Sequence, residues 1–266
     1  MAVINNFFAL FGKPVFIVLN FFNALGSFIV FQLKLLPLLF KPPFRIKEIF
    51  IQIDVVGIGS IGVIALTGIF TGMVEAVQLY QGFHEFGAES MMGYTIFISI
   101  SKELGPVFAG LMVTSRAISA MAAELGTMRV TEQIDALDVL AVDSKKYLII
   151  PRIVATTLSL PILVALFDFL GNISAYGIAT YALGVNPTEY TQTINMYLGY
   201  SEIFSGILKG AVFGFVISSI GTYIGYTAGG GAKGVGEATT NAVVASAIMI
   251  FVLDYFLSAL FLFLDW

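Results

Sequence analysis

The feature that most constrains this chain is the length of its apolar runs. Four stretches carry at most one charged side chain each: residues 55–74, 153–188, 210–232 and 238–264. The hydrocarbon core of a bilayer is about 30 Å thick, and a helix needs about 20 mostly apolar residues to cross it. These runs therefore predict an all-α integral membrane protein.

Charged residues are also too few for a soluble protein of this size. Asp, Glu, Lys and Arg make up 11% of the 266 residues and the mean hydropathy is +0.93, whereas a soluble domain is about 25% charged. This balance excludes a soluble enzyme and a disordered or fibrous chain. The absence of Cys and the single histidine, His84, predict no metal site. The net charge of −4 predicts no nucleic-acid partner.

We predict five spans, at about residues 53–80, 91–120, 148–183, 202–228 and 238–263. With this arrangement, all of the 13 Lys and Arg residues except three intramembrane ones lie on the side of the N-terminus. Cytoplasmic segments of membrane proteins carry an excess of Lys and Arg. We therefore expect a cytoplasmic N-terminus and a C-terminus on the opposite side.

The first part of the chain differs from the five spans. Residues 1–47 are rich in Phe but contain scattered Lys and several prolines, including Pro14 and Pro37. Proline is expected to interrupt a helix, and aromatic residues with sparse Lys suit the membrane interface. We predict an N-terminal interfacial region over 1–47, followed by a five-span domain over 48–266. A sixth span is the alternative.

A charged pair, Lys102 and Glu103, lies inside the second predicted span. A charge at the bilayer centre costs roughly 2.5–3.5 kcal/mol on insertion scales, and such residues face a cavity or a partner. Pro106 follows closely and removes one helical hydrogen bond. We predict a broken helix with a polar constriction here. The alternative is a pair near the span end that extends to the interface.

The stretch over about 124–143 is the most charged part of the middle of the chain. Its apolar positions recur at helical spacing: Val130, Ile134, Leu137 and Ala141. Acidic residues lie on another side: Glu132, Asp135 and Asp138. This pattern predicts one amphipathic cytoplasmic helix, either a docking helix or a solvated loop helix. We expect Arg116 to pair with Glu124 or Asp254 at the cytoplasmic end of the second span.

Nucleotide-binding motifs give no support for ATP binding by this chain. Two G-x-G-x-x-G matches, at 57–62 and 229–234, follow no strand, and no G-x-x-x-x-G-K-[ST] motif occurs. If ATP is used, we expect another chain to bind it.

Two blocks of the sequence contain runs of residues that are longer and more specific than the motifs above. The first contains KELGP at 102–106, AAELGTMRVTEQIDAL at 122–137, AVD at 141–143 and Pro151-Arg152. The second contains GVG at 234–236, followed by ATT, AVV, Ser246 and Asp254-Tyr255. Both blocks resemble the MlaE permease family, the membrane subunits of MCE-type phospholipid ABC transporters. The resemblance covers about residues 45–260.

Three positions depart from the family pattern. The family usually has Arg where this chain has Lys102, often Gly where it has Ser115, and Pro where it has Ser144. Lys keeps the charge of Arg but lacks its planar fork, so bidentate phosphate binding at this position is lost.

The resemblance implies an assembly. Such permeases form homodimers in the bacterial inner membrane, with ATPase subunits on the cytoplasmic side, an MCE-domain protein on the periplasmic side and, as a further expectation, a small STAS-type cytoplasmic subunit. The 124–143 helix would be the coupling helix. Its expected ATPase contacts are Glu124, Arg129, Glu132, Asp135 and Asp138.

The expected function is that of a permease subunit, not of an enzyme, and it requires no cofactor. It would move phospholipid between the inner membrane and the MCE protein and so maintain outer-membrane lipid asymmetry. The expected polar residues of the lipid pocket are Lys102, Glu103 and Arg116. The expected apolar wall residues are Leu79, Tyr80, Phe97, Val107 and Leu111. An ion- or proton-coupled secondary transporter and a membrane scaffold are the alternatives.

Overall fold

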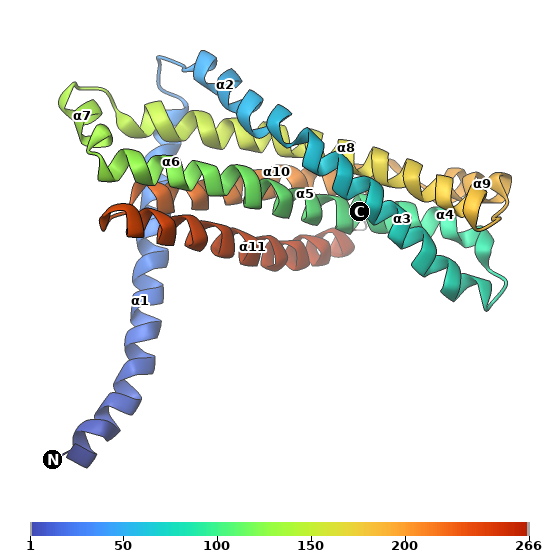
Figure 1. Cartoon of the computed structure of the whole chain (residues 1–266), viewed down its shortest axis with the longest axis horizontal. Coiled ribbons are helices and arrows are strands. Elements are labelled where there is room, and N and C mark those ends of the chain that lie inside the picture. The colour runs from blue at the N-terminus through green and yellow to red at the C-terminus, as the bar shows by residue number, and fades with distance from the viewer. Residues whose placement is uncertain (1, 265–266) are drawn as a thin grey trace. The chain divides into compact units, whose positions relative to one another are not determined.

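The computed structural model describes residues 2–264, which are helical almost throughout and contain no strand (Figure 1). Within the first helix, side chains are described for residue 19 and from residue 22 onward. The chain forms two compact units, Met1–Phe44 and Arg45–Trp266. The predicted all-α membrane fold is confirmed, with six helices long and apolar enough to cross a bilayer.

The first unit is one long helix, α1 (Ala2–Leu39). It continues through Pro14 and Pro37, so the predicted interruption at these prolines is wrong. A proline removes only one hydrogen bond of the ladder, and the remaining bonds hold the helix on both sides. The stretch Phe22–Leu39 is long and apolar enough to span a membrane. Helix length therefore agrees with the sixth span as well as with an interfacial helix.

Each of the five predicted spans overlaps one apolar helical stretch of the second unit, although the predicted ends at 183 and 228 lie one and two residues beyond the helices. The stretches are Ile46–His84, Glu89–Val130, Lys145–Ala182, Tyr200–Tyr226 and Gly231–Phe263. Most of these stretches extend beyond the predicted limits, because the helices continue past the apolar runs into the more polar connections.

The first three spans contain short 3₁₀ or π turns, which interrupt the first two spans and lie at both ends of the third. The first comprises α2 (Ile46–Val56), a 3₁₀ turn (Ile58–Ser60) and α3 (Ile61–His84). The second comprises a 3₁₀ turn (Glu89–Met91), α4 (Met92–Ser99), the π turn η3 (Ile100–Leu104), α5 (Gly105–Val113), a π turn (Thr114–Ile118) and α6 (Ser119–Val130). The third comprises a π turn (Lys145–Ile149), α8 (Ile150–Gly177) and a π turn (Ile178–Ala182). The last two spans are α10 (Tyr200–Tyr226) and α11 (Gly231–Phe263).

Two short helices join consecutive spans. Helix α7 (Gln133–Val139) follows the second span, and α9 (Pro187–Tyr197) follows the third.

Helix α8 lies at the centre of the second unit. It packs against α3 and α10, and α10 packs in turn against α6 and α11 (Figure 1). Glycines permit the close approach. A Cβ atom at Gly72 would collide with the carbonyl of Gly171, and a Cβ at Gly206 would collide with the carbonyl of Ser101. Small residues at such crossings favour helix association in lipid, where backbones gain from close van der Waals packing.

The stretch 124–143 is not the single amphipathic helix that its periodicity predicts. Helix α6 continues the second span to Val130, the chain turns at Glu132 with φ of 61°, and α7 follows. Of the predicted apolar stripe, Ile134 is fully buried, whereas Val130 is exposed. The predicted apolar stripe is not continuous, because Glu132 lies within it and its left-handed backbone conformation changes the direction of the chain.

Candidate functional site: an ion cluster inside the helix bundle

The strongest polar cluster of the second unit is centred on Lys209 of α10, which is 1% exposed. Its ammonium group donates hydrogen bonds to Glu103 Oε2 at 2.5 Å, Asp254 Oδ1 at 2.9 Å and Ser258 Oγ at 2.7 Å. Glu103 comes from the π turn η3, whereas Asp254 and Ser258 come from α11. Three spans therefore contribute to one site.

The cluster satisfies each hydrogen-bonding group of the lysine. An ammonium has three donors, and all three have an acceptor here. The Ser258 hydroxyl also donates to Glu103 Oε1 at 3.1 Å, so it links α11 to the π turn that carries Glu103. Buried charges are tolerated only with good geometry and further hydrogen bonds, and both conditions are met.

A cavity of about 260 Å³ adjoins this cluster. Its lining residues are Lys102, Glu103, Ser205, Lys209, Ser258, Phe261 and Leu262. The charged pair of the second span, Lys102 and Glu103, is among these lining residues. The walls combine ionic groups with apolar side chains, which suits an amphipathic ligand.

The helix around the pair is not broken as predicted. Ile100–Leu104 forms a π turn, and α5 begins immediately afterwards with Pro106 in its first turn. Proline is well tolerated there because the first N–H groups of a helix lack helical partners. The π turn supplies the local irregularity instead, as such turns often do at functional sites.

Arg116 has partners different from those predicted. Its guanidinium donates to the carbonyl of Val55 at 3.1 Å and to Ser60 Oγ at 3.2 Å, where α2 meets α3. Both predicted acidic partners are engaged elsewhere. Glu124 pairs with Arg152 at 2.8 Å, and Asp254 pairs with Lys209. Arg116 thus stabilises the end of α2, whose last carbonyl groups have no helical partner.

The predicted lipid-pocket residues do not gather in one cavity of the described chain. Lys102 and Glu103 line the cavity beside the cluster, whereas Phe97 lines a different one. The others line none of the three cavities described for residues 2–264: Leu79, Tyr80, Val107, Leu111 and Arg116. Tyr80 instead stacks on His84, with ring centroids 4.9 Å apart. Their role at a lipid site stays a prediction.

Sequence reasoning did not place Lys209 and Ser258 at the site. Lys209 carried a usable signal, because it is the only cation of its span, whose one other charged residue is Glu202 near its start. The sequence could not show which of the intramembrane carboxylates pairs with Lys209. Ser258 carried no signal, since serines occur throughout the spans.

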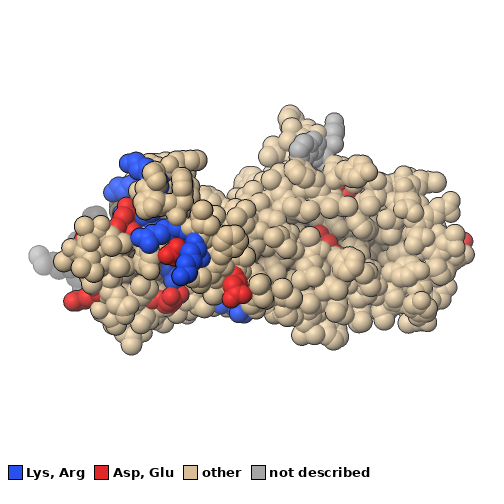
Figure 2. All heavy atoms as spheres, turned by 90° about the horizontal axis from the view of Figure 1, so that it is seen from above, with Lys and Arg blue, Asp and Glu red and all other residues tan. Residues whose placement is uncertain are grey.

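The residues predicted to contact an ATPase lie around the turn between α6 and α7. Arg129 pairs with Asp135 at 2.6 Å, and Asp138 Oδ1 accepts a hydrogen bond from the backbone of Ser144. Glu132 is exposed at the turn itself. Figure 2 shows Lys and Arg gathered at the end of the second unit that carries α2, α6 and α7, whereas the opposite half of the face shown is almost uncharged.

Apolar spans with an ion cluster and a cavity between them define a multi-pass membrane protein of the transporter class. A family model described as Permease MlaE matches residues 49–260. The chain belongs to the MlaE permease family.

Three relatives illustrate the range of similar proteins. The chain is 43% identical over 239 residues to a probable ABC transporter permease protein of Rickettsia bellii, covering 90% of this chain and 92% of the relative. It is 33% identical over 263 residues to the intermembrane phospholipid transport system permease protein MlaE of Haemophilus influenzae, covering 97% and 98%. It is 40% identical over 210 residues to the chloroplast protein TRIGALACTOSYLDIACYLGLYCEROL 1 of Arabidopsis thaliana, covering 79% and 60%.

Proposed function

We propose that this chain is the permease subunit of an ATP-driven phospholipid transporter in a bacterial inner membrane. It exchanges phospholipid between that membrane and a periplasmic MCE-domain protein, and so helps to maintain outer-membrane lipid asymmetry. The observation that carries the proposal is the cavity beside Lys209, Glu103 and Asp254, which combines charged and apolar walls within the spans. A phospholipid likewise combines a charged headgroup with apolar chains. The name of the Haemophilus relative agrees with this substrate class.

The proposal includes a second copy of the chain. A cavity of about 260 Å³ lies below the roughly 300–1,000 Å³ typical of small-molecule sites, and a two-chain phospholipid is larger than most such molecules. A homodimer in which two such cavities face each other would provide the missing volume. The MCE-domain protein and a small STAS-type subunit are proposed from the family resemblance alone.

The energy source in this proposal is ATP hydrolysis in a separate subunit. This chain contains no P-loop motif, and in this proposal the exposed turn between α6 and α7 is the contact surface on the cytoplasmic side. ATP binding would shift the permease between states with different affinities for lipid. In this orientation the N-terminus is cytoplasmic and the C-terminus periplasmic.

Charge reversal at the α6–α7 turn is expected to weaken ATPase binding. In the double variant Glu132→Lys/Asp135→Lys, two exposed carboxylates become cations, so complementary charges on the partner are repelled. We expect about a tenfold or greater loss of co-purified ATPase. The matched control is Glu189→Lys, an exposed charge reversal on α9. Normal recovery of the ATPase with the double variant would contradict the docking assignment.

The proposal as a whole is tested by purifying the chain in mild detergent with its partners. Mass spectrometry of the complex should find an ATPase, an MCE-domain protein and phospholipid. Recovery of the chain without an ATPase, with transport that follows an ion gradient, would instead support the alternative of a secondary transporter. The observation behind that alternative is the ion cluster, because intramembrane carboxylates can also take part in proton relays.

A further inference from the structure

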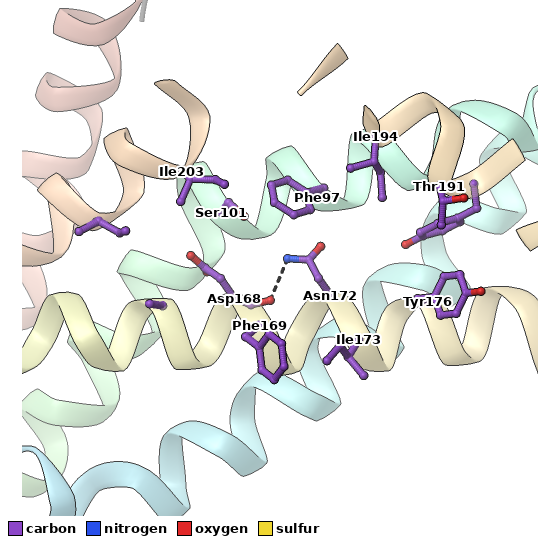
Figure 3. A pocket seen from close by; sticks show the side chains of 13 residues that line it. Phe97, Ser101, Asp168, Phe169, Asn172, Ile173, Tyr176, Thr191, Ile194 and Ile203 are labelled. Atoms are coloured by element: carbon purple, nitrogen blue, oxygen red, sulfur yellow. Dashed lines mark hydrogen bonds between the residues drawn. The ribbon is translucent and has the colours of Figure 1, made fainter. Parts of the chain in front are cut away.

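A second cavity shares no lining residue with the cavity beside the Lys209 cluster. It measures about 400 Å³ and is enclosed by α4, η3, α8, α9 and α10 (Figure 3). Its walls are mostly apolar, including Phe97, Ile173, Ile194 and Ile203. The volume falls within the range of about 300–1,000 Å³ typical of small-molecule sites.

Two buried polar atoms belong to residues in the wall of this cavity and have no hydrogen-bond partner among the described residues. They are Asp168 Oδ1 of α8 and Ser101 Oγ of η3. Asp168 is 8% exposed and Ser101 is 1% exposed. Figure 3 shows the Asp168 side chain directed towards the helix that carries Ser101, at one end of the cavity, with Tyr176 and Thr191 at the other end.

The surroundings offer Asp168 no counterion among the described residues. None of the ion pairs formed by residues 2–264 includes it. Asn172 donates to the backbone carbonyl of Asp168, not to its carboxyl group. Tyr190, also in the wall, cannot be a counterion, because a phenol is neutral and its ionised form is an anion. The charged groups of the Lys209 cluster line a separate cavity.

The bilayer cannot satisfy these groups either. An unpaired polar group in hydrocarbon costs several kcal/mol, because no water is present to bond it. A carboxyl group accepts hydrogen bonds in either protonation state, and a serine hydroxyl both donates and accepts. A partner that both satisfies these residues and fills the mostly apolar cavity therefore carries a hydrogen-bond donor on an apolar body.

Access to the cavity is from the side of the bundle. Phe169, Ile173 and Ile203, which line it, are exposed. A molecule dissolved in the bilayer can therefore enter between α8 and α10 without passing through the Lys209 cluster.

From these observations we infer that the cavity beside Asp168 and Ser101 is a second lipid site, which binds one aliphatic chain carrying a hydroxyl or amino donor. The donor bonds to Asp168, and Ser101 supplies the complementary group. This site is independent of the proposed transport pathway, so either can fail alone.

The test uses matched probes with the full chain in nanodiscs of phosphatidylcholine, whose headgroup has no hydrogen-bond donor. The probes are 1-dodecanol, its methyl ether and dodecylamine, each with a photoreactive diazirine at the end of the chain. Labelled peptides are mapped by mass spectrometry. We expect the alcohol to label the cavity segments of α8 and α9 about tenfold more than the ether, which has the same chain but no donor.

Variants assign the effect to the two polar groups. Asp168→Leu should lower labelling by the alcohol to the level of the ether, whereas Thr157→Val, a similar polar-to-apolar change on the same helix, should leave the ratio unchanged. Ser101→Ala provides a second variant if Asp168→Leu does not fold. Stronger labelling by the amine than by the alcohol would assign an amino lipid, and the reverse a hydroxyl lipid. Equal labelling by alcohol and ether in the unaltered chain, or label outside these segments, would overturn the inference.

Discussion

Replacing Lys209 by Met is expected to destabilise the protein strongly and to abolish lipid transport. The substitution leaves Glu103 and Asp254 facing each other without the ammonium that bonds both. Removing one partner of a fully buried ion pair costs about 3–5 kcal/mol. The Glu103 and Asp254 side chains are 45% and 21% exposed, so we expect a loss of about 3 kcal/mol at most. Thermal unfolding in detergent measures the first effect, and transfer of labelled phospholipid in proteoliposomes with the ATPase measures the second.

A triple variant separates the two effects. Lys209→Met/Glu103→Gln/Asp254→Asn removes every charge of the cluster, so it should recover most of the stability lost in the single variant. Transport should stay low if the charges act on the lipid. Lys233→Met, at a lysine whose side chain is 88% exposed, is the control and should change neither property. Unaltered stability of Lys209→Met would show that the cluster does not form in the membrane.

The second large effect is expected from Gly206→Ala. The new Cβ would collide with the carbonyl of Ser101 and separate α10 from η3. Overpacking of this kind costs about 1–3 kcal/mol. Because Lys209 lies one turn further along α10 and Glu103 lies in η3, the contact between them should lengthen, and transport should fall with stability.

The matched control is Gly177→Ala, at a glycine of α8 with open space around its Cβ position. Alanine is favoured over glycine in a helix by up to about 1 kcal/mol, so this variant should be as stable as the unaltered chain or slightly more so. If both alanine variants behave alike, the close approach of α10 to η3 is not required for the fold.

The buried polar groups also show how the two cavities of the bundle differ. At Lys209, each donor has an acceptor within the chain, so the site is complete before a ligand binds. At Asp168 and Ser101, the partners are missing among the described residues. A ligand at the first site would bind in the cavity beside a complete ion cluster, whereas a ligand at the second would itself supply the missing hydrogen bonds.

Local expectations failed where the backbone conformation of one or two residues decided the outcome. Pro106 was expected to break a helix, but a π turn precedes it and α5 begins there instead. The apolar periodicity across Val130 and Ile134 predicted one helix, but Glu132 adopts a left-handed conformation between them. Periodicity reports which positions are apolar and contains no information on a single reversed φ angle.

The sequence by itself determined the membrane class, the number of central spans and the family. Run length and scarcity of charge suffice for the first two, because the free energy of entering a bilayer is a sum over residues that requires no knowledge of their contacts. Only the tertiary structure decided the partners of the intramembrane charges. Lys209 is 106 residues from Glu103 and 45 from Asp254, so their meeting depends on how three helices pack, a relation that spacing along the chain does not encode.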